Sequence, residues 1–394
     1  MNGADSPNNR RRDVPGVALR ALCLLVTLAI NGTAMAESPS RQAAEGNSRV
    51  DAPAETGRLF VYISLGGEQQ IAIYEMDAKT GTLTAAGKVA LSGVPGCLAV
   101  GPKREFLYAA IRSTDSVTTL RIDSRTGGLT PVKTVPVAGN PVYLAVDHTG
   151  RNLLTASYSG DKAAVYPIGR DRTVAARATQ ILDMDDAPHS ILMDPSNRFV
   201  FIPNTLASTI FQFHFDSWTG TLTPAAVPKL INEKGTGPRH VFFHPSLDVV
   251  YFVNETNSSV TAYKLAGRSG MLSTLETLST LPAGFSGENS CADIELTPSG
   301  RFLYASNRGH DSIAAFAVDP DTGRLTSLGQ EATEKTPRSF NIDPTSRFLY
   351  AAGQSSGRLA SYRIDSASGR LRPLAVYDVG SGPSWVLVAK LPGK

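Results

Sequence analysis

Short apolar segments separated by turn residues recur along the chain after its first 57 residues. The segments are rich in Val, Ile, Phe and Tyr, which favour strands, and Gly, Pro, Asn and Asp interrupt them. One aromatic or leucine anchor recurs in each unit, at spacings of 46, 46, 47, 50, 53 and 46 residues. The anchors are Tyr62, Tyr108, Leu154, Phe201, Tyr251, Tyr304 and Tyr350. A repeat of this length is typical of a propeller built from four-stranded units.

Two other signals stay in register with these anchors. In six of the seven units a glycine stands 19 residues after the anchor, preceded by Thr or Ser and followed two places later by Leu. Such a glycine suits the positive φ of a hairpin turn. In five of the six internal units a proline stands 13 residues before the anchor, and in the sixth Cys291 replaces it. The prolines are Pro95, Pro141, Pro188, Pro238 and Pro337.

This repeat predicts an all-β fold, a seven-bladed β-propeller over residues 58–394. The region begins at Arg58 with a strand of the second position in a blade. It ends at residues 384–388 with a strand of the first position. We therefore expect the last blade to be closed by N-terminal strands plus the C-terminal strand.

The first 36 residues have the pattern of a secretory signal peptide. Arginines at 10–12 precede an apolar run at 21–30, and small residues at 34–36 predict cleavage after Ala36. A retained membrane anchor is the less favoured alternative, because the run is short and interrupted. Arg11 and Arg12 also permit twin-arginine export, although ordinary secretion fits the following residues better.

The segment that follows, residues 37–57, is rich in Ser, Ala, Glu and Pro and poor in apolar residues. This composition predicts a disordered linker, because such a segment cannot bury enough apolar surface to fold. Together the two segments predict a periplasmic or secreted protein whose folded domain is the propeller.

The net charge argues against two classes of partner, and the positions of the cysteines argue against a disulfide. The formal net charge of +3 on 394 residues gives no concentrated basic field, so we expect neither nucleic acid nor, after signal removal, a membrane as partner. Cys97 and Cys291 fall in non-adjacent blades, which favours two separate buried thiols over a disulfide. We expect a monomer.

Two columns of the repeat should meet at one mouth of the channel, because the loops entering the first strand and leaving the second strand lie there. The residues after the proline position are Gly96, Val142, His189, Arg239, Ala292, Arg338 and Ser384. The residues four after the anchor are Gly66, Arg112, Tyr158, Thr205, Glu255, Arg308 and Gln354. The residues just before the latter include Asn204, Asn254 and Asn307. This gathering of arginines predicts a site for a small anionic or polyhydroxylated ligand, with Glu255 and His189 as its proton carriers.

Structural roles are the alternative for several of these residues. Arg239 and Glu255 can form an ion pair with no further function. His240 and His244 are predicted to be structural, with His244 in the turn position that Asp147, Asp194 and Asp343 occupy in other units. His310 is equally compatible with a rim loop and with a ligand contact. The asparagines can cap strand ends instead of touching a ligand.

Other chemistries find no support in the sequence. The six histidines are scattered over four units, and there is no Cys-x-x-Cys, no G-x-S-x-G, no phosphate-binding loop and no dinucleotide fingerprint. We therefore expect neither a metal nor another cofactor.

Several stretches resemble the seven-bladed lactonase family, which includes the propeller-type 6-phosphogluconolactonases and the fungal carboxymuconate cyclases. They are PRH at 238–240, YFVNE at 251–255, RFLYASNRGHDSIAAF at 301–316 and PRSFNIDP at 337–344. The resemblance covers roughly residues 58–390. It implies that His189 and Glu255 match the family's proposed acid/base pair, and that Arg239 and Arg308 match its anion-binding arginines. Asp293 and Glu295 stand where the family also carries an acidic residue.

We therefore expect an exported, metal-independent lactonase that hydrolyses a sugar-acid or related small anionic lactone. The expected catalytic residues are His189 and Glu255. The expected substrate-binding residues are Arg239, Arg308, Arg338, Arg112, Tyr158, Asn254, Asn307, His310 and Gln354. Two alternatives remain: a muconate-type cycloisomerase that uses the same base and arginines, and a secreted propeller that binds a partner and catalyses nothing.

Overall fold

The computed structural model describes residues 57–393. The predicted signal peptide, and all of the predicted linker except Gly57, lie outside these residues. Within the described part, no helix is long and apolar enough to cross a membrane. The single helical element there is a three-residue 3-10 turn, η1 (Arg112–Thr114).

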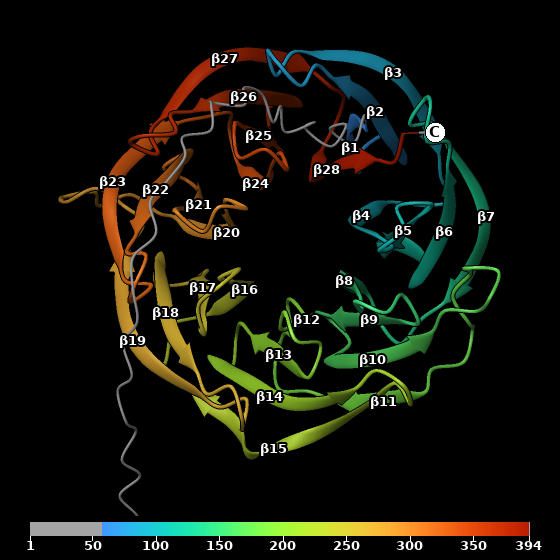
Figure 1. The fold of residues 1–394 in the computed structure, drawn as a ribbon, viewed down its shortest axis with the longest axis horizontal. Helices are drawn as coiled ribbons and strands as arrows, with labels where there is room; N and C mark the ends of the chain where they lie inside the picture. Colours follow the sequence, from blue (N-terminus) through green and yellow to red (C-terminus); the bar gives the residue numbers. More distant parts are fainter. Residues whose placement is uncertain (1–56, 394) are drawn as a thin grey trace, which may run out of the picture. The chain divides into compact units, whose positions relative to one another are not determined.

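Seven four-stranded antiparallel sheets form a ring of blades around a central channel (Figure 1). Blade 1 contains β4 (Pro95–Val100), β5 (Phe106–Ile111), β6 (Ser116–Ile122) and β7 (Leu129–Pro136). Blade 2 contains β8 (Pro141–Val146), β9 (Asn152–Ser157), β10 (Lys162–Pro167) and β11 (Gln180–Asp183). Blade 3 contains β12 (Leu192–Met193), β13 (Phe199–Asn204), β14 (Thr209–Asp216) and β15 (Thr221–Ile231). Blade 4 contains β16 (Pro238–Phe243), β17 (Val249–Asn254), β18 (Ser259–Leu265) and β19 (Leu272–Ser279).

The other three blades complete the ring. Blade 5 contains β20 (Ser290–Leu296), β21 (Phe302–Arg308), β22 (Ser312–Val318) and β23 (Leu325–Ala332). Blade 6 contains β24 (Pro337–Ile342), β25 (Phe348–Gly353), β26 (Arg358–Ile364) and β27 (Leu371–Asp378). Blade 7 contains β28 (Pro383–Leu391), β1 (Arg58–Leu65), β2 (Gln70–Met76) and β3 (Leu83–Ala90). The seven-bladed prediction is confirmed.

Blade 7 joins the two ends of the folded region. Its sheet runs in the order β28-β1-β2-β3, so the C-terminal strand is innermost and the three N-terminal strands lie outside it. Tyr62 in β1 stands opposite Leu387 in β28, within an antiparallel ladder that extends from Arg58 to Leu65. The predicted closure is therefore confirmed, and the ring is held shut by the full length of one strand pair.

The two main sequence signals of the repeat meet across blade boundaries. The hydroxyl of Tyr251 donates to the carbonyl oxygen of Gly323 in the next blade at 2.7 Å, and Tyr304 does the same to Gly369 at 2.7 Å. The turn glycines have positive φ, for example 71° at Gly323, as predicted. A Cβ on Gly369 would lie 2.3 Å from the ring of Phe302 in the preceding blade, so no larger residue fits. The anchor and the glycine recur together because the anchor tyrosine of one blade donates a hydrogen bond to the turn glycine of the next.

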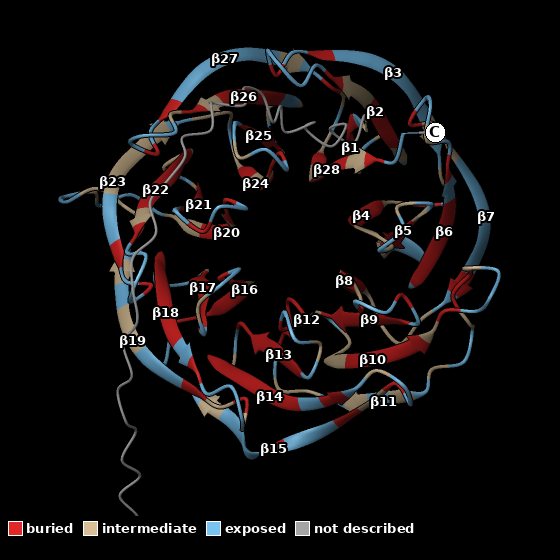
Figure 2. Cartoon of the chain, viewed as in Figure 1, coloured by how far each residue is buried: buried red, intermediate tan, exposed pale blue. Residues whose placement is uncertain are grey.

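The hydrophobic core lies between the blades. One cluster packs Val249 and Tyr251 of blade 4 against Leu303 and Phe316 of blade 5, and six similar clusters follow the ring. Inner strands are buried on both faces, whereas the outermost strands are exposed along most of their length (Figure 2). Because each blade buries apolar surface against two others, the ring supports the loops at its mouth rigidly.

The predicted turn role of His244 is confirmed. Its Nδ1 accepts hydrogen bonds from the backbone N–H of Ser246 and Leu247, while Nε2 donates to the carbonyl oxygen of Gly300. The carboxylates of Asp194 and Asp343 accept backbone N–H groups in the corresponding turns.

Candidate active site

A β-bulge at the start of the innermost strands directs the first column of the repeat toward the channel mouth. In blade 4 the pairing passes from Pro238–Asn254 to His240–Val253, which leaves Arg239 without a partner residue. The same shift in blade 6 skips Arg338, and that in blade 2 skips Val142. A bulged residue leaves the strand ladder, which re-aims its side chain. The expectation that this column reaches one mouth is confirmed.

The mouth encloses a cavity of about 250 Å³. Six of the seven first-column residues line it, and Gly66, Arg112 and Gln354 line it from the second column. His240, Cys97 and Trp385, each one residue after a first-column residue, also line the cavity. A volume of this size suits a small molecule with one ring.

Glu255 does not itself line this cavity, but it contacts Arg239, which does, and it lies between Arg239 and Arg308. Its Oε1 accepts a hydrogen bond from Nη2 of Arg308 at 2.6 Å, and its Oε2 lies 3.0 Å from Nε of Arg239. The second contact lacks hydrogen-bond alignment, so Oε2 has no hydrogen-bond partner among the described residues. Burial alone would raise the pKa of Glu255, but the charges of Arg239 and Arg308 hold it below its usual value. Glu255 is therefore an ionised proton acceptor at neutral pH.

Arg308 is fixed by more than this carboxylate. Its Nη2 also donates to the carbonyl oxygen of Cys291 at 2.9 Å. The side chain of Glu255 remains 24% exposed toward the mouth, whereas that of Arg239 is only 2% exposed. Burial, and then repulsion from Arg308, lowers the pKa of Arg239 to about 9, which still leaves it charged at pH 7.

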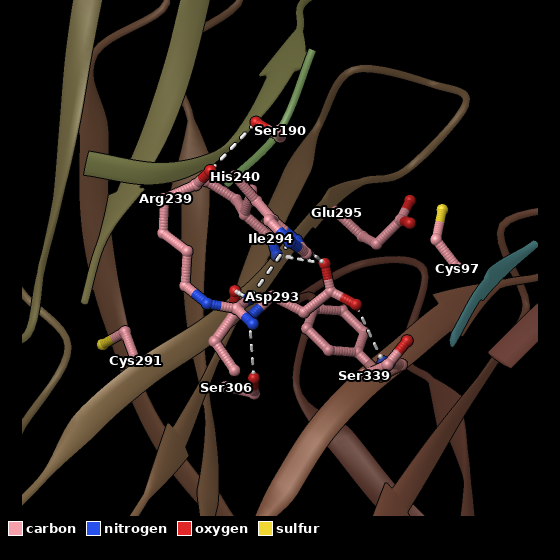
Figure 3. Close-up of polar contacts among 12 residues, drawn as sticks. Cys97, Ser190, Arg239, His240, Cys291, Asp293, Ile294, Glu295, Ser306 and Ser339 are labelled. Atoms are coloured by element: carbon pink, nitrogen blue, oxygen red, sulfur yellow. Dashed lines mark hydrogen bonds and ion pairs between the residues drawn. The ribbon is translucent and has the colours of Figure 1, made fainter. Parts of the chain in front are cut away.

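A chain of buried polar contacts holds the guanidinium of Arg239 in place (Figure 3). Its Nη1 lies 3.1 Å from Nε2 of His240, and Nδ1 of His240 lies 2.8 Å from Oδ1 of Asp293. A guanidinium can only donate, so Nε2 accepts and Nδ1 carries the proton that is donated to Asp293. Nη1 of Arg239 also donates to the carbonyl oxygen of Ala292. The geometry of Arg239 is therefore fixed by a neutral imidazole and a carboxylate.

His240 and Asp293 require a correction of the sequence interpretation. His240 was expected to be structural, yet its side chain lines the cavity as well as supporting Arg239. Burial, and then the charge of Arg239, lowers the pKa of His240 to about 4, so it stays neutral. Asp293 was noted only as standing where the family carries an acidic residue. The pairing of a histidine with a carboxylate 53 residues later could not be found from spacing within one unit.

His189 contributes a nitrogen without a partner. Its Nδ1 is buried and has no hydrogen bond with any described residue, and its ring lies 5.2 Å from that of His240 and 5.4 Å from that of Tyr158. Burial, followed by the charge of Arg239, places the pKa of His189 well below its ordinary value. The imidazole is therefore neutral and can accept or donate a hydrogen bond at the cavity wall. Tyr158 lies behind His189 and does not itself line the cavity.

Residues 59–388 match the family described as lactonase, 7-bladed β-propeller. The chain belongs to this family. It is 40% identical over 245 residues to the 6-phosphogluconolactonase of Pectobacterium carotovorum, which covers 62% of this chain and 73% of that protein. It is 38% identical over 242 residues to the 6-phosphogluconolactonase of Serratia proteamaculans, covering 61% and 72%. The predicted family and the predicted class of enzyme, a lactonase, are confirmed.

A solved structure in this lactonase family shows the same architecture. The periplasmic gluconolactonase of Pseudomonas aeruginosa superposes with a TM-score of 0.79 at 26% identity, covering 85% of this chain and all of that one.

Asn254, Asn307 and His310 were also predicted to bind substrate, but like Tyr158 and Arg308 they are not among the residues that line the cavity. Asn254 donates to the hydroxyls of Ser259 and Thr261, and Asn307 donates to the Thr280 carbonyl and to Ser312. His310 contacts Ser312 through Nδ1 and packs against the ring of Phe285. These contacts cap strand ends and order a loop. They match the structural alternative for each residue.

Neither of the two cysteines in the described residues forms a disulfide. Cys97 and Cys291 are free and buried, which confirms the expectation of separate thiols. Burial raises the pKa of Cys291 to about 11, so it is a poor nucleophile. The described residues contain no group of three or more His, Cys, Asp or Glu side chains arranged to hold a metal ion.

Proposed function

We propose that this lactonase hydrolyses the lactone of a sugar acid or a related small anionic acid, with Glu255 as the general base. The observation that carries the proposal is the carboxylate of Glu255 clamped between Arg239 and Arg308 at the edge of the cavity. This arrangement supplies a proton acceptor next to two oxyanion-binding groups, which are the two requirements of ester hydrolysis.

The two arginines lower the barrier of the proposed reaction by stabilising negative charge on the lactone carbonyl oxygen. Glu255 takes a proton from a water molecule, whose oxygen then bonds to the lactone carbonyl carbon. The loss of charge on Glu255 leaves Arg239 and Arg308 uncompensated at the moment when the carbonyl oxygen becomes negative. Both guanidiniums then stabilise that oxygen. As the ring C–O bond breaks, the proton on Glu255 returns to the departing ring oxygen, and the carboxylic acid product is formed.

His189 and His240 have different proposed roles. The unpartnered Nδ1 of His189 at the cavity wall orients the attacking water or a substrate hydroxyl. We do not assign proton abstraction to His189, because an imidazolium there would add positive charge beside Arg239 and Arg338. His240 is a positioning residue that holds Arg239.

Export is part of the proposal. The signal-like sequence of residues 1–36 supports it, and a structural relative bears the name of a periplasmic gluconolactonase. A non-phosphorylated sugar lactone is then a more accessible substrate than a phosphorylated one.

The test is a pH-indicator assay of purified mature protein, from residue 37 onward, against five- and six-membered sugar-acid lactones and aromatic-acid lactones. Spontaneous hydrolysis is subtracted, and a parallel series contains a chelator. We expect hydrolysis of at least one sugar-acid lactone, unaffected by the chelator. Cyclisation of a muconate-like diacid without lactone hydrolysis would support the cycloisomerase instead. No turnover of any substrate would overturn the proposal.

A further inference from the structure

The cavity holds two arginines that the proposed reaction does not use. Arg338 lines the cavity from blade 6 and has no hydrogen bond or ion pair with any described residue. Arg112 lines it from blade 1, and its side chain donates only to the neutral Asn140, at 3.0 Å. Arg239 and Arg308, by contrast, share the carboxylate of Glu255. Neither of these two arginines forms an ion pair with a described residue, although the charges of Glu255 and Asp293 partly offset that of Arg338.

The space between these two arginines is kept open by residues without bulky side chains. Arg338 and Arg112 flank blade 7, which contributes Gly66, Gly67 and Gly382 to the cavity wall. Its first-column residue is the small Ser384. A substituent of the ligand can therefore reach both arginines over blade 7.

Gly96 allows the side chain of Arg112 to reach the cavity. A Cβ at this position would lie 3.0 Å from Cδ and 3.1 Å from Cγ of Arg112, closer than side chains normally pack. Gly96 occupies the column position that holds His189, Arg239 and Arg338 in other blades. The missing side chain on blade 1 thus provides the path along which Arg112 extends.

The electrostatics agree with this geometry. Burial, and then repulsion from Arg308 and Arg112, lowers the pKa of Arg338 to about 10. Like charges that repel each other in a partly buried site are stabilised when an anion binds between them. Gln354, on the same wall, adds an amide donor.

We propose that Arg112 and Arg338, with Gln354, form a subsite for an anionic substituent of the substrate, a phosphate monoester or a second carboxylate, next to the groups that bind the lactone carbonyl. This inference rests on the proposed function for the placement of the carbonyl at Arg239 and Arg308. It divides the arginines into a pair that serves the reaction and a pair that selects the substrate.

The kinetic test compares three substrates that share a sugar-acid lactone: glucono-1,5-lactone, its 6-phosphate ester, and glucaro-1,4-lactone with its free carboxylate. Arg338→Gln and Arg112→Gln should raise KM for the preferred anionic lactone by about tenfold to a hundredfold. KM for the uncharged lactone should stay within twofold. The preferred anionic lactone identifies phosphate or carboxylate as the group bound. The exposed Arg370→Gln is the matched control, with no change expected for any substrate.

Gly96→Ala tests the same subsite without removing a charge. It should raise KM for the anionic lactone several-fold more than KM for the uncharged lactone. An equal rise of KM for charged and uncharged lactones in all three cavity variants would overturn the subsite, as would no change in any of them.

A binding measurement separates this inference from the proposed function. Titration calorimetry with inorganic phosphate and with glutarate, on wild type and Arg338→Gln, requires no turnover. Binding that is lost in Arg338→Gln supports the subsite even if no lactone is hydrolysed. Binding of neither anion by the wild type, or equal binding by the variant, contradicts it even if lactones are hydrolysed.

Discussion

The two sides of the channel mouth differ in how their charges are balanced. On blades 4 and 5, Arg239 and Arg308 meet Glu255, and Arg239 also meets the His240–Asp293 pair. On the opposite side, Arg112 and Arg338 flank blade 7 without a carboxylate partner among the described residues. Both sides are built from the same columns of the same repeat. The difference is the basis of the proposal that equivalent positions serve the reaction on one side and substrate selection on the other.

The largest effect is expected from opening blade 7, over which the uncompensated arginines face each other. Deletion of residues 383–394 removes β28, the innermost strand of that blade and the full partner of β1. We expect loss of the cooperative thermal transition, because β1 and the cores on both sides of blade 7 become exposed. Calorimetry measures this, with deletion of residues 393–394 as the control. A truncated protein that melts like the wild type would show that the ring does not depend on this closure.

The two arginine pairs should differ in their contribution to the free energy of unfolding. Arg239→Met leaves the carboxylate of Glu255 and the acceptor of His240 without their partner, and breaking a buried ion pair costs roughly 3–5 kcal/mol. Arg338→Met removes a buried cation that forms no ion pair with a described residue and is repelled by Arg308, so the free energy of unfolding should be unchanged or higher. Urea unfolding of both variants measures the contrast. Equal destabilisation by both changes would mean that Arg338 has a structural counter-ion, and the proposed division of the mouth would fail.

The pH dependence of the free energy of unfolding should reflect His240, which lies on the side of the mouth where the charges are paired. The folded-state pKa of His240 is about 4, below the ordinary value of 6.5. The unfolded state therefore binds more protons between these two values, and stability is complete above about pH 6.5 and lost as the pH falls toward 4. His189 has the same sign of shift.

His240→Gln should therefore reduce the drop in melting temperature between pH 7 and pH 5 without abolishing it. The exposed His148→Gln is the matched control and should keep the wild-type drop. If His240→Gln also retains the full drop, then His240 is not held neutral by its surroundings.

The smallest effect is expected at His310, which lies outside both sides of the mouth. His310→Ala removes contacts with Ser312 and Phe285 but none with the cavity wall. We expect kcat/KM for the preferred lactone to stay within twofold of the wild type. A loss of tenfold or more would place the loop that carries His310 at the substrate after all.

The fold could be read from the sequence because its signals are local and repeated. The anchor Tyr304 and the turn glycine Gly369 recur at fixed spacing, since each blade must latch to the next in the same way. The site was only partly accessible. Column positions indicated Arg239, Glu255 and Arg308, because the bulge and the exit loop place every blade's residues at one mouth.

Contacts between blades could not be read in this way. The columns did not show that Asn254 and Asn307 turn into their own strands, or that His240 pairs with Asp293 of the next blade. Nor did they show that Gly96 makes room for Arg112. Each depends on side-chain direction, and a column fixes only the position of the backbone.

The most direct test of the account is the kcat/KM of Glu255→Gln for the preferred lactone. Glutamine keeps the volume of the side chain and an oxygen that can accept from Arg308, but it cannot take a proton from water. We predict a decrease of about 10²- to 10⁴-fold, the usual contribution of a general base, with a cooperative melting transition retained. A variant that keeps its kcat/KM within threefold of the wild type would contradict the assignment of Glu255 as the base.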